Sequence, residues 1–255
     1  MTAVQVTRPS QQLARVKVDR AEYANALTPE LALDLANAIT AAGETANCVI
    51  LESAGPVFCA GGDYGFLETV SKTDESTALD SIETTFQGVI RSIAATPAVV
   101  VAVLQGPALG AGAEIALACD IRIASTRAWL EESWIHLGLI PALGGAYYLP
   151  RILGIGSAME ILLTGRRIEP TECFQAGIYQ RLADPEELTA VVDAMGAEIA
   201  TKDTTAVRTI KRLCRQSVDY DLNDSLMLSA RAQAQCLSGD GFRSAIATRL
   251  RQVRS

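Results

Sequence analysis

The sequence contains too few histidines for most histidine-dependent chemistry. Its 255 residues include one histidine, His136, so a histidine-rich metal site is impossible and a Ser-His-Asp triad could use only that residue. The six cysteines form no short CxxC pair, and several of them lie in apolar runs. We therefore expect no bound metal, and buried reduced thiols in a cytoplasmic protein.

Basic charge and long apolar runs are missing as well. The net charge is −7 and no basic stripe dominates, which argues against a nucleic-acid partner. No segment approaches the ~18 uninterrupted apolar residues of a transmembrane helix. The first ten residues, MTAVQVTRPS, contain no apolar run of the kind that a secretory signal needs. We expect binding to neither nucleic acid nor membrane.

Short apolar strands alternate with helical patterns along the first part of the chain. Strands are predicted at ARVKVD (14–19), CVILES (48–53), AVVVAVLQG (98–106) and IRIAS (121–125). Helices are predicted at 28–44, at 77–95 and from the Asp184-Pro185 pair onward. This alternation indicates the α/β class. Because strand signals fade after about residue 157, we divide the chain into a core, 1–199, and a C-terminal helical region, 200–255.

Two glycine-rich turns each follow a predicted strand. The first is FCAGGD (58–63) and the second is QGPALGAGAE (105–114), which ends on a lone acid, Glu114. Neither turn is a GxGxxG motif or a P-loop. Small residues permit close packing of strand and helix. They also permit backbone N–H groups to approach a ligand oxygen, and two converging donors would form an oxyanion hole.

Five blocks in this order resemble the crotonase (enoyl-CoA hydratase/isomerase) family. They are DRAEYANAL (19–27), FCAGGD (58–63), GPALGAGAEIALACDIRIAS (106–125), LGLIPALGGAYYLPRILG (137–154) and LLTGRRIEPTECFQAGI (162–178). The resemblance covers nearly the whole chain. It implies an α/β fold built as a crotonase-like spiral of ββα units, followed by a C-terminal helical trimerisation region. It also implies a homotrimer or a dimer of trimers.

The resemblance further implies a thioester substrate, usually an acyl-CoA, and an enolate-like intermediate. Matched residue by residue, the oxyanion-hole donors are the backbone N–H groups of Gly62 and Ala111, and Glu114 is the catalytic acid/base. Two fixed donors in a dry pocket stabilise an enolate, and removal of one such donor typically costs ~3–4 kcal/mol. No cofactor is expected apart from the CoA or pantetheine that the substrate carries.

The chain departs from the family at the position of the second glutamate of the hydratases, where it has Trp134. A tryptophan offers only one N–H donor and cannot act as a general base. Glu131 and Glu132 lie three and two residues away, and a local shift could bring one of them in, although we expect charges beside a loop to be solvated. Trp134, Glu132 and His136 are our candidates for the substrate pocket, with a structural or surface role favoured for His136.

One branch of the family, the aryl-CoA dehalogenases, also carries a tryptophan at the position of Trp134. Its nucleophilic aspartate would match Ala142, which has no carboxylate, so covalent displacement of a halide is excluded.

Two further departures leave the substrate carrier open. Lysines are common in the family where this chain has Glu22 and Gly65, and both would face the nucleotide phosphates of CoA. A thioester of an acyl-carrier protein is therefore an alternative to acyl-CoA. We expect a hydratase/isomerase-like enzyme. The alternatives are a decarboxylase or other specialised crotonase acting on a carrier-protein thioester, and a non-catalytic paralogue of the same fold. The acyl chain and the exact reaction stay open.

Overall fold

The computed structural model describes residues 3–254, with side chains as far as residue 252. The chain divides into two compact units, with the boundary between Ala200 and Thr201. The second unit consists of three helices: α10 (Thr204–Gln216), α11 (Leu222–Ser238) and α12 (Asp240–Arg254). Both β-sheets and the two glycine-rich turns belong to the first unit.

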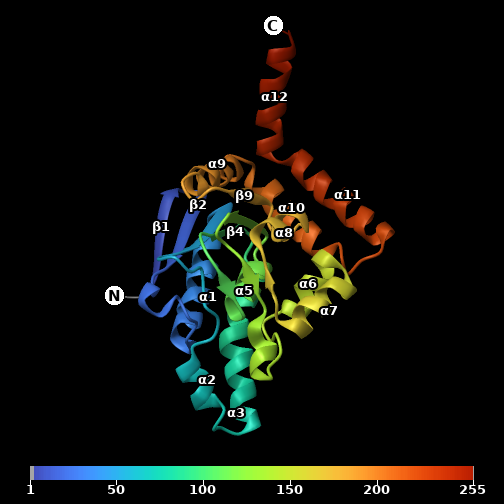
Figure 1. Ribbon diagram of the computed structural model, residues 1–255. Helices are drawn as coiled ribbons and strands as arrows, with labels where there is room; N and C mark the ends of the chain where they lie inside the picture. Colours follow the sequence, from blue (N-terminus) through green and yellow to red (C-terminus); the bar gives the residue numbers. More distant parts are fainter. Residues whose placement is uncertain (1–2, 255) are drawn as a thin grey trace. The chain divides into compact units, whose positions relative to one another are not determined.

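A six-stranded sheet forms the centre of the first unit (Figure 1). Its strands, in spatial order, are β1 (Val4–Ser10), β2 (Leu13–Val18), β3 (Cys48–Ser53), β4 (Val99–Leu104), β6 (Ile121–Ser125) and β9 (Arg181–Ala183). The first pair is antiparallel and the remaining neighbours are parallel. The four strands that the sequence predicts are therefore all present in this sheet.

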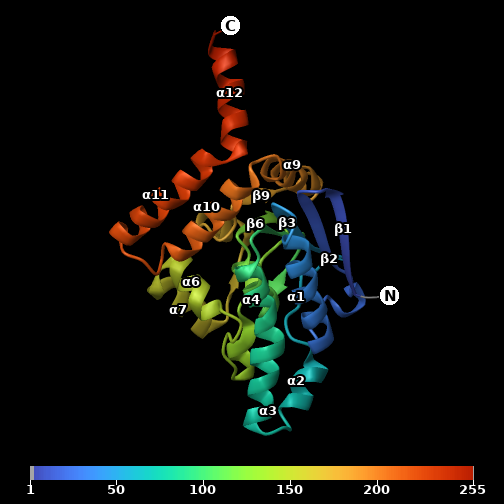
Figure 2. The same ribbon diagram turned by 180° about the vertical axis from the view of Figure 1, so that it is seen from behind.

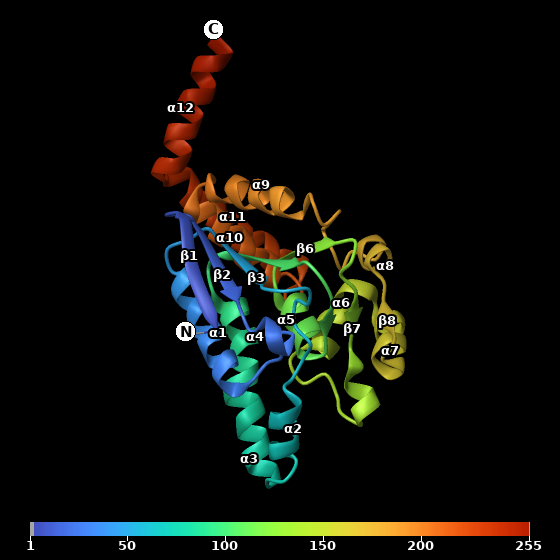
Figure 3. The same ribbon diagram turned by 60° about the vertical axis from the view of Figure 1, so that its left-hand side comes forward.

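Helices cover both faces of the sheet. Figure 2 shows α1 (Pro29–Gly43) beside α4 (Gln87–Ala95), and Figure 3 shows α9 (Leu188–Ala200) on the other face. Successive side chains of a strand point to opposite faces. Along β4, Val100 and Ala102 accordingly join the core under α1 and α4, whereas Val101 and Val103 join the core under α9.

A second, three-stranded sheet lies next to the glycine-rich turns. It pairs β5 (Ala108–Leu109) with β7 (Leu130–Glu131), and β7 with β8 (Arg167–Ile168). A strand of each sheet followed by a helix makes the expected ββα unit: β4, β5 and α5 (Ala111–Ala118), and then β6, β7 and α6 (Gly145–Leu153). The other elements are η1 (Ala21–Tyr23), α2 (Tyr64–Val70), α3 (Glu75–Asp80), η2 (Ser81–Phe86), η3 (Ser133–Leu137), α7 (Ile155–Thr164) and α8 (Pro170–Gln175).

The predicted start of α1 is confirmed in atomic detail. The Thr28 hydroxyl accepts a hydrogen bond from Leu31 N at 3.2 Å, and Pro29 is the first helical residue. An N-cap side chain satisfies one of the donors that the first turn leaves open, and proline has no N–H to satisfy there.

Three elements differ from the sequence prediction. Strand β1 was not predicted, because it is an edge strand whose residues after Val4 are exposed and show no buried face. The helix expected at 77–95 begins at Glu75 and passes through a π-helical turn at Ser81–Phe86. Helix α9 begins at Leu188, since the residues just after Pro185 form a turn first.

Candidate active site

Hydrogen bonds between their backbones hold the two glycine-rich turns side by side. Phe58 N donates to Pro107 O at 2.9 Å, and Leu109 N donates to Cys59 O at 2.9 Å. A side chain at Gly112 would collide with the Cys59 carbonyl, so glycine is needed there for the close approach. Two segments about fifty residues apart in the sequence thus form one continuous surface.

The backbone N–H groups of Gly62 and Ala111 lie on this surface. Neighbouring amides are engaged: Asp63 N donates to Leu27 O at 3.0 Å, and Gly110 N donates to Glu131 O at 2.8 Å. Among residues 3–254, the structure records no hydrogen bond from the N–H of Gly62 or of Ala111. A Cβ placed on Gly61 would lie 3.8 Å from Ala111 N, which shows how closely the turns meet. The two N–H groups that are predicted as donors from the sequence therefore lie on turns that contact each other.

Glu114 lies in the first turn of α5 and is completely buried. Its Oε1 accepts hydrogen bonds from Leu143 N at 2.7 Å and Gly145 N at 2.8 Å, and its Oε2 accepts one from Trp134 Nε1 at 3.0 Å. Burial raises the pKa of Glu114 to about 7, and these hydrogen bonds, which favour the ionised form, oppose the rise. A carboxyl poised near neutrality can both take and give a proton.

The Trp134 indole connects Glu114 with both turns. Beyond the hydrogen bond from its Nε1, the ring packs against two glycines: a Cβ on Gly110 would lie 3.0 Å from Cε2, and a Cβ on Gly62 would lie 3.4 Å from Cη2. Trp134 is half-buried. One flat ring therefore forms a wall that extends from the carboxyl to the turn carrying the Gly62 N–H.

Glu132 is buried rather than solvated, so the sequence expectation for it is wrong. Its residue exposure is 2%, whereas the Glu131 side chain is 19% exposed and lies 3.8 Å from Arg167. Side chains alternate along a strand, so Leu130 and Glu132 face inward and Glu131 faces outward. The Glu132 carboxyl contacts Gly145, and a Cβ there would lie 2.8 Å from its Oε1.

Neither carboxyl oxygen of Glu132 has a hydrogen-bond partner within the described part of the chain. Burial raises the pKa of Glu132 well above its ordinary value, and the negative charge of the neighbouring Glu114 raises it further. The structure thus brings together Glu114, Glu132 and Trp134, while His136 is exposed and directs Nε2 to Gly165 O at 3.1 Å.

Three other polar or reactive residues near the turns have structural surroundings. Asp63 caps α2 by accepting a hydrogen bond from Phe66 N at 3.1 Å and pairs with Arg20 at 3.1 Å. Burial raises the pKa of the Cys59 thiol to about 11, which makes it a poor nucleophile. Tyr147 is exposed and stacks under the Arg151 guanidinium at 3.5 Å. None of these groups contacts the Glu114 carboxyl.

The described residues contain neither a metal-binding cluster nor a membrane-spanning helix. No group of three or more histidine, cysteine, aspartate and glutamate side chains could hold a metal ion there. In the same part of the chain, no helix is long and apolar enough to cross a membrane.

Comparison with known proteins supplies the family. The family model described as enoyl-CoA hydratase/isomerase matches residues 8–249. The chain belongs to the enoyl-CoA hydratase/isomerase family, the crotonase family. A crotonyl-CoA hydratase of Syntrophomonas wolfei is 31% identical over 238 residues, which are 91% of this chain and 89% of that protein.

Solved structures agree with the family's fold. The crystal structure of an enoyl-CoA hydratase from Bacillus anthracis aligns with a TM-score of 0.91 at 28% identity, over 98% of this chain and 97% of that one. A Thermobifida fusca protein solved in complex with acetoacetyl-CoA aligns with a TM-score of 0.84 at 30% identity, over 92% and 95% of the two chains. The crotonase fold predicted from the sequence is confirmed.

Sequence reasoning missed the groups that hold Glu114 in place. The Leu143 and Gly145 amides are backbone donors, and nothing in their side chains announces the role. The available signal was the glycine pair in PALGG at the start of α6, because a helix N-terminus presents free N–H groups to an anion.

Proposed function

We propose that this crotonase-family protein is an enoyl-CoA hydratase/isomerase-type enzyme that works through a thioester enolate. The observation that carries the proposal is the pair of backbone N–H groups, those of Gly62 and Ala111, on the surface that Trp134 joins to the buried Glu114 carboxyl. The N–H pair would receive the thioester oxygen as negative charge develops on it. Glu114 would exchange protons with the substrate through Oε2, since both acceptor positions of Oε1 are occupied by amides.

Hydration of a 2-enoyl thioester balances with these groups. Glu114 takes a proton from water while the water oxygen bonds to the β-carbon, and the electron pair of the double bond moves through the α-carbon onto the thioester oxygen. The enolate then collapses, and Glu114 gives the proton that it took from water to the α-carbon as the new C–H bond forms. Isomerisation uses the same oxyanion and carboxyl, with a proton removed at one carbon and returned at another. CoA enters with the substrate, and the proposal requires no further cofactor.

The substitution Glu114→Gln tests this function. It retains the size of the side chain but removes the proton-transfer group, which typically contributes 10²–10⁴-fold to a rate. We expect kcat/KM for short trans-2-enoyl-CoA substrates to fall by about that factor, with an unchanged circular dichroism spectrum. Glu131→Gln is the matched control, because the Glu131 side chain is directed away from the site and toward Arg167. Equal small rates for wild type and Glu114→Gln would refute the role of Glu114 and favour a non-catalytic paralogue.

We propose CoA, rather than a carrier protein, as the thioester carrier. The support is the family and the relative solved with acetoacetyl-CoA. The acidic Glu22 is exposed, so solvent and salt can screen its charge from a nucleotide phosphate. Saturation by free acyl-CoA at micromolar concentration would support the proposal, whereas turnover of only the carrier-protein thioester would overturn it.

We also propose a homotrimer or a dimer of trimers in the cytoplasm. Helix α7 carries exposed apolar side chains four residues apart: Ile155 (71%), Met159 (53%) and Leu163 (64%). Exposed stripes of this kind mark subunit contacts. The six cysteines, all within the described residues, are free thiols, which fits a reducing compartment. Light scattering at micromolar concentration tests the oligomeric state, and a monomer in solution would overturn it. Cell fractionation tests the cytoplasmic location.

A further inference from the structure

The buried carboxyl of Glu132 differs from that of Glu114 in its hydrogen-bond donors. Glu114 accepts three hydrogen bonds from N–H groups, all of which favour its ionised form. Glu132 is as deeply buried, yet no N–H or O–H group within the described residues donates to either of its oxygens. An ionised carboxylate without donors in an apolar interior is very costly, so such a group keeps its proton.

The carboxyl groups of Glu114 and Glu132 both lie beside Gly145. The amide of Gly145 donates to Glu114 Oε1 at 2.8 Å, and the α-carbon of the same residue is in contact with Glu132. Glu114 is the charged neighbour that acts on Glu132, while Gly145, which lies against the Glu132 carboxyl, carries no charge. Two carboxylates in such proximity cannot both ionise near neutral pH, and the difference in donors decides which one does.

We propose that Glu114 and Glu132 form one acid–base pair that holds a single proton at slightly alkaline pH, with Glu132 as its protonated member. Glu132 is a positioning residue: it acts through Glu114, by keeping that carboxyl the ionised one, and does not itself touch the substrate. The chain thereby has a second carboxyl beside Glu114 although position 134 is a tryptophan. The inference rests on the proposed function for its catalytic meaning, but the protonation state can be measured independently of any activity.

The pair has a specific consequence for pH dependence. Protonation of Glu114 at low pH removes the base, and activity falls on the acid side. Loss of the last proton at high pH places a second negative charge beside Glu114 and the developing enolate, so activity falls again on the alkaline side. Coupled groups titrate in such separate macroscopic steps.

Infrared difference spectroscopy tests the protonation state directly. The spectrum of wild type minus Glu132→Gln at pH 8 should contain the C=O band of a protonated carboxyl group. The control difference, wild type minus Glu131→Gln, records the spectral change caused by replacing the neighbouring glutamate, which is partly exposed and lies near Arg167. An ionised carboxylate in the Glu132 difference spectrum at pH 8 would overturn the pair while leaving the proposed function intact.

The pH profile of kcat/KM tests the role. We expect Glu132→Gln to retain activity within about tenfold at pH 7 and to lose the alkaline limb, since glutamine has no proton to lose, whereas Glu131→Gln keeps both limbs. An alkaline limb shared by all three proteins would refute the pair. A loss above a hundredfold at pH 7 in a folded variant would refute the positioning role. Glu132→Met, an apolar residue of similar length, repeats both measurements if the glutamine variant does not fold.

Discussion

The hydrogen bond from Trp134 to Glu114 should set the pH at which the site becomes active. The indole Nε1 donates to Oε2 at 3.0 Å, and this bond favours the ionised carboxylate. The substitution Trp134→Phe retains an aromatic wall against Gly62 and Gly110 but removes the donor. Because the ionised form then loses a partner, the pKa of Glu114 rises further.

The size of the effect follows from the type of bond. A hydrogen bond to a charged group contributes about 1.5–3 kcal/mol, and about 1.4 kcal/mol corresponds to one pKa unit, so we expect a rise of roughly 1–2 units. Wild-type Glu114, with a pKa of about 7, is half ionised at pH 7. A rise of that size would leave roughly 1–10% ionised, so kcat/KM at pH 7 should fall by about 5- to 50-fold.

The assay is the loss of the conjugated thioester absorbance of a trans-2-enoyl-CoA, measured as kcat/KM between pH 5 and 9. The acid limb of the Trp134→Phe profile should be displaced to higher pH, and the deficit should shrink as the pH rises. Trp129→Phe is the matched control: Trp129 is the other tryptophan of the chain, and its ring is stacked on Arg167 at 3.6 Å. An acid limb that stays in place, or that moves equally in the control, would refute the reasoning.

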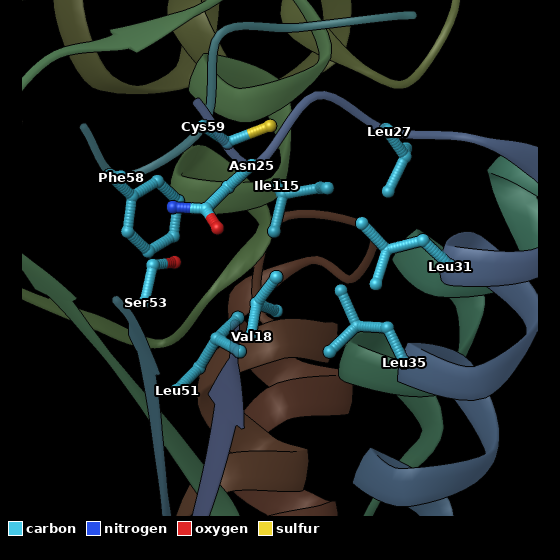
Figure 4. A pocket seen from close by; sticks show the side chains of 10 residues that line it. All are labelled: Val18, Asn25, Leu27, Leu31, Leu35, Leu51, Ser53, Phe58, Cys59 and Ile115. Atoms are coloured by element: carbon cyan, nitrogen blue, oxygen red, sulfur yellow. The ribbon is translucent and has the colours of Figure 1, made fainter. Parts of the chain in front are cut away.

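Three further predictions concern packing and stability. Val18→Ile should fill part of the apolar cavity of about 20 Å³ whose lining residues Figure 4 shows, and one buried methylene should add roughly 0.8 kcal/mol to the free energy of unfolding, measurable by urea unfolding. Gly110→Ala should destabilise the protein and lower kcat/KM, because its φ of +46° disfavours a side chain and the new Cβ would press on Trp134; an unchanged Tm would contradict this. Glu132→Gln should have a higher Tm than wild type, and the difference should grow between pH 5 and 8. The wild type loses stability as the pH rises through this range, because its folded form keeps the proton on Glu132 while its unfolded chain releases that proton.

Much of the fold could be predicted because its signals are local. Strands β3 and β4 are continuous apolar runs, and the Thr28-Pro29 pair fixes the start of α1 by satisfying the first turn. The glycines at 61 and 112 mark turns that approach another backbone segment closely. These features depend on a few neighbouring residues, so the sequence contains them directly. The edge strand β1, whose pairing and exposure are set by its single neighbour, could not be recognised in this way.

The candidate site was predictable only in part, because its electrostatics depend on tertiary contacts. The positions of Gly62, Ala111 and Glu114 were identified from motif resemblance. The Leu143 and Gly145 amides could not be, since every residue but proline carries such a donor. The burial of Glu132 depends on the phase of a two-residue strand, β7, that is too short to show a pattern in the sequence.

The short strand β7 explains both why Glu132 faces inward and why Trp134 contacts Glu114 at the position of the expected second glutamate. Gly110 N donates to Glu131 O, and β7 pairs with β5, so the segment is held against the turn that carries Ala111. Because the Glu131 side chain points outward and side chains alternate along a strand, the next side chain, that of Glu132, points inward toward Gly145. The 3₁₀ turn of η3 then brings residue 134 back over Gly110, where a side chain meets Glu114 Oε2. At that point a donor is needed if Glu114 is the ionised member of a pair, and the indole N–H supplies it, whereas a second carboxylate there would compete for the same charge. Trp134 and Glu132 are thus complementary: one stabilises the negative charge on Glu114, and the other keeps its own proton so that the charge stays there.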